Sequence, residues 1–373
     1  MKIVHVTSVH PWNDVRIYQK MCRSLARAGH EVHLVAPEPV AGAPRAAAAD
    51  GISLHLVPRR SGRVRRVIGT ARDAADTAIG LQADVLHFHD PELLPYFAGG
   101  SRRRSTRIVY DVHEDHRNSV AERSWAPQGV RQLLGWSLGW YEDLVSPRMS
   151  AIVTATPRIA ERFRRHPLVQ VIQNFPELEA DPFASGGGRR PVPGRFAYIG
   201  VISDGRCIGE MIEAVAMLGT SATLDLAGHW ERAGRAAECR KLPGWSRVRE
   251  LGMVSRSEVF AMLTCVEAGL VLFRPLKNHV NAQPNKLFEY MLAGLPVIAS
   301  DFPLWRALIE PEGAGLLVDP ESTEAIAGAM RWMLAHPDEA AAMGRRGRAA
   351  VLERYNWQGE FTKLLTLYER LMI

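Results

Sequence analysis

The sequence predicts an α/β protein built from two doubly wound domains, each with a parallel sheet covered by helices on both faces. Short β-branched runs alternate with helical patterns through both halves of the chain, and this order favours parallel sheets. A stretch rich in proline, glycine and arginine separates the halves, and 373 residues suit two domains better than one core. We therefore expect two domains joined by a linker, with a cleft between them.

The first domain is expected over residues 1–176 and opens with a strand–helix–strand unit. Helical periodicity covers residues 15–28, where Gly29 provides the stop, and recurs in an arginine-rich stretch and in a long segment ending near Ser146. The strands of this domain are predicted at 3–6, 32–35, 52–57, 84–89, 107–113, 151–155 and 169–174.

Periodicity is lost over residues 177–194, which we interpret as the linker. The second domain is expected over residues 195–355, and Ser255 with Glu258 forms a capping box that opens one of its helices. A helix over residues 356–373 is a candidate to pack back on the first domain. The other predicted elements are strands at 196–200, 224–228, 269–273, 296–300 and 316–318, and helices at 208–218, 231–241 and 286–293, with two helical stretches before the last helix.

The composition is that of an ordinary folded protein and excludes several classes. Hydrophobic residues make up 47% and charged residues 23%, so disorder, collagen and coiled coil are poor fits. No run approaches the ~18 apolar residues of a membrane span, and Met1 leads into a strand pattern rather than a signal peptide. The four cysteines are far apart, which excludes a zinc ribbon and offers no disulfide framework. We expect a cytoplasmic protein with reduced thiols.

Arginine carries most of the positive charge, and two arginine stretches fall in the first domain. The formal net charge is +6, and the stretches run over residues 59–66 and 102–107. One hypothesis is that they dock the protein at the inner, anionic face of a membrane or bind an anionic acceptor. The alternative is a solvated face in a chain biased toward arginine. Nucleic acid is disfavoured as a partner because no aromatic residues are interleaved with these arginines.

Open α/β sheets bind ligands beyond the carboxyl ends of their strands, so the loops there are the candidate sites. Neither a Gly-x-Gly-x-x-Gly loop nor a Gly-Lys-[Ser/Thr] phosphate loop is present. Residues 198–206 run from a strand into a helix and place Gly200, free amides and Arg206 where a helix N-terminus favours an anion. A phosphate fits this loop; the alternative is an ordinary turn with a solvated arginine.

A second loop, over residues 281–300, leads into a helix predicted from Asn285 to Ala293. Pro284 suits its first turn, and Glu289 would lie near its start, one turn from Lys286. A carboxylate there can accept two hydrogen bonds from vicinal hydroxyls such as those of a ribose, and the lysine could meet a phosphate. The alternative is a carboxylate stabilised by the helix dipole beside a solvated lysine.

Residues 200–206, 281–300 and 301–305 together resemble the nucleotide-sugar site of the family 4 glycosyltransferases, which are retaining enzymes of the GT-B fold. Blocks in the first domain resemble matching strand ends of these enzymes, namely residues 5–11, 14–17, 87–94, 109–115 and 173–176. The blocks occur in the right order over nearly the whole chain. The resemblance implies two Rossmann-like domains facing each other across a cleft, the N-terminal one on the acceptor side and the C-terminal one binding the nucleotide sugar.

The resemblance also implies roles for individual residues of the second domain. Glu289 matches the glutamate that grips the donor ribose, and Arg206 matches the basic residue that neutralises the diphosphate. Gly200 would let the diphosphate approach the backbone closely. Asn285 and Lys286 belong to the same nucleotide-binding segment.

In the first domain, His113 matches the histidine that faces the donor sugar from the opposite domain, and we place it with Glu114 at the catalytic centre. The candidates for contact with the acceptor or the donor sugar are Asp14, Arg16, Asp90 and Asn281.

The sequence departs from the family pattern at three places. The first glutamate of the family's Glu-x7-Glu motif is Asn281, and the arginine often found after the glycine is Val201. An amide is uncharged and also donates hydrogen bonds, so the contacts to the donor sugar are in question. Lys286 is our hypothesis for the replacement of the missing phosphate-binding charge. Trp12-Asn13-Asp14 stands where the family commonly has two glycines.

Several polar and aromatic residues have a structural interpretation beside the functional one. His87 and His89 lie on one strand, where a histidine is more often a satisfied core residue, and His89 with Asp90 at the strand end are the better site candidates. The histidine pair could suggest metal ligands, but nothing completes a carboxylate cage, so no metal site is predicted. Trp136 and Trp140 are interpreted as the packed face of a helix, with an acceptor platform as the alternative.

The predicted reaction is transfer of a sugar from a nucleoside-diphosphate sugar, with a UDP-sugar favoured, to a hydroxyl of a glycan, glycolipid or glycosylated natural product. The resemblance implies retention of configuration without a metal or other cofactor, by same-face attack with the departing phosphate as base. Two alternatives stay open. A sugar-nucleotide epimerase on the same fold would need no acceptor, and a non-catalytic nucleotide-sugar-binding partner would fit the departures at Asn281 and Val201.

Overall fold

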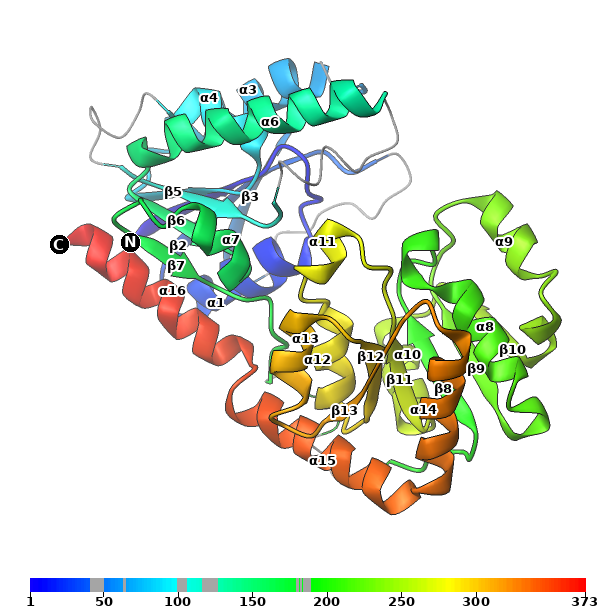
Figure 1. Ribbon diagram of the computed structural model, residues 1–373. Helices are drawn as coiled ribbons and strands as arrows, with labels where there is room; N and C mark the ends of the chain where they lie inside the picture. The colour runs from blue at the N-terminus through cyan, green and yellow to red at the C-terminus, as the bar shows by residue number, and fades with distance from the viewer. Residues whose placement is uncertain are drawn as a thin grey trace. The chain divides into compact units, whose positions relative to one another are not determined.

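The computed structural model describes residues 1–40, 50–62, 65–98, 106–115, 127–178, 181, 183 and 189–373. The chain divides into two compact units (Figure 1). Unit 1 comprises Met1–Asn174 together with Trp357–Ile373, and unit 2 comprises Phe175–Asn356. Each unit has one parallel sheet with helices on both faces, so the predicted fold class of two doubly wound α/β domains is confirmed.

The sheet of unit 1 has the strand order β3-β2-β1-β4-β5-β6-β7, and its described pairings are all parallel. Its strands are β1 (Lys2–Val6), β2 (Glu31–Pro37), β3 (Ile52–Val57), β4 (Val85–Phe88), β5 (Arg107–Val112), β6 (Ala151–Thr154) and β7 (Val169–Val171). Because β1, β4 and β5 are neighbours, the segments that follow them meet at one edge of the sheet. The site candidates predicted in the first domain lie at this edge of the sheet.

Helices cover both faces of this sheet (Figure 1). One core is covered by η1 (Val15–Cys22), which is wound as a π-helix, by α1 (Arg23–Arg27) and by α16 (Trp357–Met372). The opposite core is covered by α3 (Ala71–Gly80), α4 (Leu94–Phe97), α6 (Gln128–Val145) and α7 (Pro157–Arg162). The remaining helical elements of the unit are η2 (Arg66–Thr70), η3 (Pro91–Leu93) and η4 (Ser146–Arg148).

The last helix, α16, packs on unit 1 rather than on the unit that precedes it in the chain. The indole Nε1 of Trp357 donates to Ser24 Oγ at 2.8 Å, and the hydroxyl of Tyr368 lies 2.6 Å from His87 Nδ1. Arg107 Nε donates to the carbonyl of Leu371 at 2.7 Å. These contacts hold the helix from its first turn to its last against α1, β4 and β5.

The interpretation of Trp136 and Trp140 as the packed face of a helix is wrong. Both lie on α6 with more than half of their surface exposed, at 54% and 57%. The inward positions of the helix include instead Gly135, Gly139, Glu142 and Val145. Glu142 is fully buried because its carboxylate accepts hydrogen bonds from Tyr110 and Arg162, and this network fixes the rotation of the helix.

The sheet of unit 2 has the order β10-β9-β8-β11-β12-β13, and its described pairings are also parallel. Its strands are β8 (Arg195–Ile199), β9 (Thr223–Ala227), β10 (Val248–Gly252), β11 (Ala268–Val271), β12 (Val297–Ser300) and β13 (Gly315–Val318). The strand β10 was not predicted from the sequence, since this partly exposed edge strand carries Arg249 and Glu250 rather than an apolar run.

The helices of unit 2 also form two layers. One core is covered by α8 (Ile208–Ala216), α9 (Ala233–Cys239) and α14 (Thr323–Ala335). The other is covered by α10 (Arg256–Thr264), α12 (Asn285–Leu292), α13 (Pro303–Ile309) and α15 (Pro337–Glu353). Shorter elements are η5 (Asp204–Arg206), η6 (Gly219–Ser221), η7 (Pro243–Arg247) and α11 (Lys277–Val280). The predicted capping box of Ser255 and Glu258 opens α10, so that prediction is confirmed.

Parts of three segments singled out in the sequence lie outside the described residues. These are residues 63–64 and 102–105 of the arginine stretches and residues 179–180, 182 and 184–188 of the predicted linker. In the described part of the first arginine stretch, Arg60 pairs with Asp73 and Arg66 pairs with Glu92. Among the described helices, none combines the length and the apolar character needed to span a bilayer.

Candidate functional site

In unit 2 the loop after β8 brings the backbone of Gly200 against Lys286 at the start of α12. Gly200 has φ +130°, a conformation that favours glycine, and a Cβ placed there would lie 2.9 Å from the ammonium nitrogen of Lys286. Three of the residues predicted for donor binding, Gly200, Arg206 and Lys286, are therefore brought together by the loops that follow two strands. A side chain at position 200 would be strained by this φ and would meet the end of the Lys286 side chain.

The two cations of this loop cluster rest on aromatic rings rather than on carboxylates. The guanidinium of Arg206 lies 3.6 Å from the centroid of Phe273, and the ammonium of Lys286 lies 3.8 Å from the centroid of Tyr198. Arg206 Nη1 is buried, and within the described part of the chain it has no hydrogen-bond partner. A buried guanidinium nitrogen without an acceptor is costly in free energy, and an anionic ligand would offset that cost by accepting its hydrogen bond.

The charges of this cluster act on one another. Burial and the neighbouring charge of Arg206 hold the pKa of Lys286 well below its usual range, and only Glu289 opposes this shift. Burial also lowers the pKa of Arg206. An anion bound between the two cations would relieve their mutual repulsion. The electrostatics of the cluster therefore favour the binding of a diphosphate.

The remaining donor-site candidates are exposed. Asn285 begins α12, and Glu289 lies on its second turn with its carboxylate close enough to act on Lys286. Both are therefore open to a ligand on the exposed side of the helix. Asn281 lies after α11 and donates from Nδ2 to the carbonyl of Lys277 at 2.9 Å.

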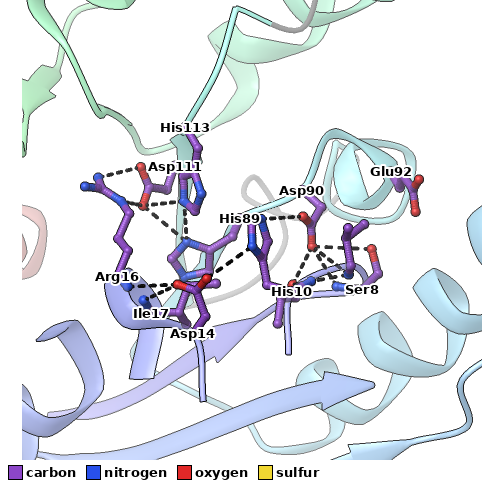
Figure 2. A network of polar contacts seen from close by, with 12 residues as sticks. Ser8, His10, Asp14, Arg16, Ile17, His89, Asp90, Glu92, Asp111 and His113 are labelled. Atoms are coloured by element: carbon purple, nitrogen blue, oxygen red, sulfur yellow. Dashed lines mark hydrogen bonds and ion pairs between the residues drawn. The ribbon is translucent and has the colours of Figure 1, made fainter. Parts of the chain in front are cut away.

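In unit 1 a buried carboxylate organises the edge of the sheet where β1, β4 and β5 end. Asp111 accepts hydrogen bonds on both oxygens from Arg16, at 2.9 Å from Nε and 2.9 Å from Nη2. The same Oδ2 lies 3.0 Å from Nε2 of His113 and 3.2 Å from Nδ1 of His89 (Figure 2). Arg16 and the histidines keep the pKa of Asp111 well below its usual range against the effect of burial.

The carboxylate of Asp111 favours the tautomers in which His89 Nδ1 and His113 Nε2 carry the proton, and these two nitrogens lie 3.1 Å from each other. In these tautomers His89 donates from Nδ1 to Asp111 and accepts at Nε2 from Nδ1 of His5 at 2.9 Å. Burial lowers the pKa of both His5 and His89 well below the ordinary value, so the two rings are neutral. His113 donates from Nε2 to Asp111, which leaves its Nδ1 as a hydrogen-bond acceptor. Arg16 is buried and directed at Asp111 and the carbonyl of Ile172, so it positions this carboxylate and is not placed to contact a sugar.

Beside His113 lies His10, which bridges two further candidates, Asp14 and Asp90 (Figure 2). Asp14 caps η1 by accepting from the backbone amides of Arg16 and Ile17. Asp90 is buried and accepts from the Thr7 hydroxyl and the Ser8 amide, each at 2.7 Å. Burial disfavours charge on His10, but the hydrogen bond with Asp14 and the charges of Asp90, Asp14 and Glu114 raise its pKa to about 9. The exposed edge of this site is therefore an imidazolium between carboxylates.

His10 should make the stability of unit 1 depend on pH. Its folded pKa of about 9 exceeds the ordinary value of 6.5, so its stabilising contribution is complete below about pH 6.5 and is lost as the pH rises through about 9. We expect His10→Gln to lower the Tm by a few degrees at about pH 6 and by less at about pH 10. Thermal unfolding of both proteins across this pH range measures the difference in Tm. A difference that does not become smaller at high pH would contradict the raised pKa of His10.

A cation could be considered at His87, His89 and Asp111, whose ligand atoms lie within 4.8 Å of one another in the described chain. Arg16 already matches the carboxylate charge, so the electrostatics of this cluster favour the hydrogen-bonded network over a bound cation. Phe88, between the two histidines in sequence, stacks on Tyr110 in the opposite core.

Two residues of the unit 1 site were not predicted. Asp111 could have been found as a carboxylate inside an apolar strand, between Tyr110 and Val112, because such a group needs a partner when buried. His10 lies four residues before its partner Asp14, but its second partner, Asp90, comes from a distant segment, so the sequence did not single it out. Glu114, which was predicted, is exposed next to this site.

Comparisons with known proteins match both halves of the chain. Residues 15–173 match the family described as "Glycosyl transferase 4-like domain", and residues 206–366 match "Glycosyl transferase-like". A GDP-mannose-dependent alpha-mannosyltransferase of Mycolicibacterium smegmatis is 26% identical over 366 residues, which cover 93% of this chain and 91% of that protein.

Two solved structures show the same fold over the full length. Sucrose-phosphate synthase from Thermosynechococcus elongatus superposes with a TM-score of 0.77 at 17% identity, covering 100% of this chain and 99% of the other. HepE of Anabaena in complex with UDP-glucose superposes with a TM-score of 0.70 at 14% identity, covering 99% and 100%.

Proposed function

The chain belongs to the family 4 glycosyltransferases, enzymes of the GT-B fold, and from this premise we propose that it transfers a hexosyl group from a nucleoside-diphosphate sugar to an acceptor hydroxyl. The observation that carries this proposal is the pair of cations, Arg206 and Lys286, held on aromatic rings, with Lys286 against the backbone of Gly200. Among the described residues neither cation forms a salt bridge with a carboxylate, although the charge of Glu289 acts on Lys286. A diphosphate supplies the missing negative charge.

In this reaction the main electrostatic demand is the charge that develops on the leaving diphosphate. Arg206 and Lys286 stabilise that charge, and Glu289 accepts hydrogen bonds from the ribose hydroxyls. His113 accepts at Nδ1 from a hydroxyl of the donor sugar, while Asp111 and Arg16 hold its ring. The configuration at the anomeric carbon is retained, with the departing phosphate taking the proton of the acceptor hydroxyl on the same face.

A thermal-shift screen against UDP, GDP, TDP and ADP tests the nucleotide part of the proposal. We propose that the donor carries UDP, with uracil as the base, a choice supported by the HepE complex named with UDP-glucose. The mannosyltransferase relative is named for GDP-mannose, so a larger shift with GDP would overturn the choice of base. Shifts with none of the four nucleotides would overturn donor binding itself.

Turnover then separates the proposal from its alternatives. The donor selected by the screen is incubated with the protein, and the sugar products are identified by NMR, which also reports the anomeric configuration. A changed sugar nucleotide formed without any acceptor would identify an epimerase. Binding without turnover over a broad acceptor panel would identify a non-catalytic partner, and an inverted product would overturn retention.

Removing the carboxylate of Glu289 is expected to weaken donor binding. We expect Glu289→Ala to raise the Kd of the nucleoside diphosphate by roughly tenfold to a hundredfold, because the ribose hydroxyls lose a charged acceptor. Isothermal titration calorimetry measures this change. Glu310, exposed at the end of α13, provides the matched control Glu310→Ala, which should bind as the native protein does. An unchanged Kd for Glu289→Ala would remove the residue from the ribose site.

A further inference from the structure

The helix α6 presents an inverted amphipathic pattern to solvent. Its exposed apolar side chains form what we call the α6 face, and their exposed fractions run from 43% to 64%. The fully inward positions over most of its length are Gly135, Gly139 and Glu142, and only at its last turns do Tyr141 and Val145 pack on the core. The α6 face consists of Val130, Leu133, Leu134, Trp136, Trp140 and Leu144. A helix normally buries such residues and exposes the charged ones, so this face calls for a partner.

The inversion is fixed by the interior of unit 1. Glu142 accepts from the Tyr110 hydroxyl at 2.7 Å and from Arg162 Nη2 at 3.1 Å, and all three groups lie on the inner side of the helix. Rotating α6 to bury its tryptophans would expel Glu142 and leave Arg162 without this carboxylate inside the protein. Trp140 is two positions from Glu142 and therefore points to the opposite side of the helix. The apolar face is thus held outward by the network that anchors the helix.

Charge distinguishes this unit from the other. Unit 1 contains 26 Lys and Arg against 18 Asp and Glu, a net charge of +8, whereas unit 2 contains 20 against 22, a net charge of −2. On α6 itself the polar residues exposed with the face are Gln132, Ser137 and Asp143, and arginines stand near both ends, at Arg131 and Arg148. A partner for this face is therefore both apolar and anionic.

We propose that the α6 face is a docking surface for an anionic membrane, into which Trp136 and Trp140 insert at the level of the headgroups. Tryptophan and leucine on one face of a helix, within a basic domain, is the pattern of helices that lie in the membrane interface. A second copy of this chain fits the face less well, because pairing through α6 would bring two units of charge +8 together. The docking is distinct from sugar transfer and does not depend on it.

Flotation with lipid vesicles tests this surface on the full chain. We expect the native protein to float with vesicles of phosphatidylcholine and phosphatidylglycerol at low salt, and much less with phosphatidylcholine alone. The double variant W136S/W140S should bind the anionic vesicles roughly tenfold or more weakly, because two interfacial anchors are lost. The matched control is M253S/L352S, which removes two exposed apolar side chains of unit 2 and should bind as the native protein does.

Three outcomes would overturn the proposal. Absence of native protein from the anionic vesicles at low salt is the first, and equal binding by W136S/W140S is the second. The third is a native dimer in light scattering that W136S/W140S converts to a monomer, which would assign the face to a second copy. The thermal shift with nucleoside diphosphate is measured on the same variants, and an unchanged shift shows that a loss of flotation is not a loss of fold or of donor binding.

Discussion

Replacing His113 with alanine is expected to lower kcat by roughly a hundredfold to ten-thousandfold, while the Kd for free nucleoside diphosphate changes by less than about threefold. The residue follows β5 in unit 1, and its Nε2 is committed to Asp111, so its Nδ1 is the atom left for the donor sugar. A hydrogen bond that strengthens as the glycosidic bond breaks acts on turnover, whereas free nucleotide carries no sugar to contact.

The two measurements are release of nucleoside diphosphate from the donor and calorimetry with free nucleotide. His30→Ala provides the control, since His30 is another partly buried histidine of unit 1 that lies outside the network. Turnover of His113→Ala within about twofold of the native rate would remove His113 from the site. A parallel loss of nucleotide affinity and thermal stability would instead indicate that the residue only supports the fold.

Replacing Arg206 with alanine is expected to lower kcat/KM by roughly a hundredfold to a thousandfold. The guanidinium lies on Phe273 with Nη1 buried and, in the described chain, unpartnered, so its charge is available to the diphosphate both in the bound donor and as the leaving group departs. Arg232→Ala is the matched control, because Arg232 is an exposed arginine that pairs with Asp204 of the same loop region. Equal kcat/KM for Arg206→Ala and the native enzyme would contradict the assignment.

The Arg206→Ala variant should also change the number of protons that the protein takes up when a nucleoside diphosphate binds. The charge of Arg206 contributes to the lowered pKa of Lys286, and a bound diphosphate would raise that pKa, so the native protein should take up protons as nucleotide binds. In Arg206→Ala the pKa of Lys286 starts higher, and less uptake is expected. Calorimetry in buffers of different ionisation enthalpy measures the difference, and uptake that is unchanged would separate Lys286 from the diphosphate.

The alternation of strands and helices could be predicted because parallel strands buried on both faces consist of continuous apolar runs. Such runs mark β1, β8 and β12, whereas β10 escaped prediction because an edge strand exposes Arg249 and Glu250. The donor-site residues could be predicted in position, because the ends of parallel strands are marked in the sequence. The packing of Arg206 on Phe273 and of Lys286 on Tyr198 could not be predicted, since Phe273 follows β11 whereas Tyr198 lies in β8.

The unit 1 site and α6 show why pattern alone is insufficient. The pKa of His10 depends on Asp14, four residues along the same loop, and also on Asp90, which follows β4, so the local sequence shows only part of its environment. The outward orientation of Trp136 and Trp140 depends on Glu142, whose burial is decided by Tyr110 and Arg162 elsewhere in the fold. Hydrophobic periodicity assumes that a glutamate faces water, and here a tertiary ion pair reverses that assumption.

The chain crosses between its two units twice, once after Asn174 and again before Trp357, and this has a consequence for synthesis. On the ribosome, residues 357–371 emerge only after all of unit 2 has been made. Until then the part of the first sheet that α16 covers is exposed, and His87 lacks the hydroxyl of Tyr368. The half of the protein encoded first is thus completed last, the reverse of the usual order in which domains mature during translation.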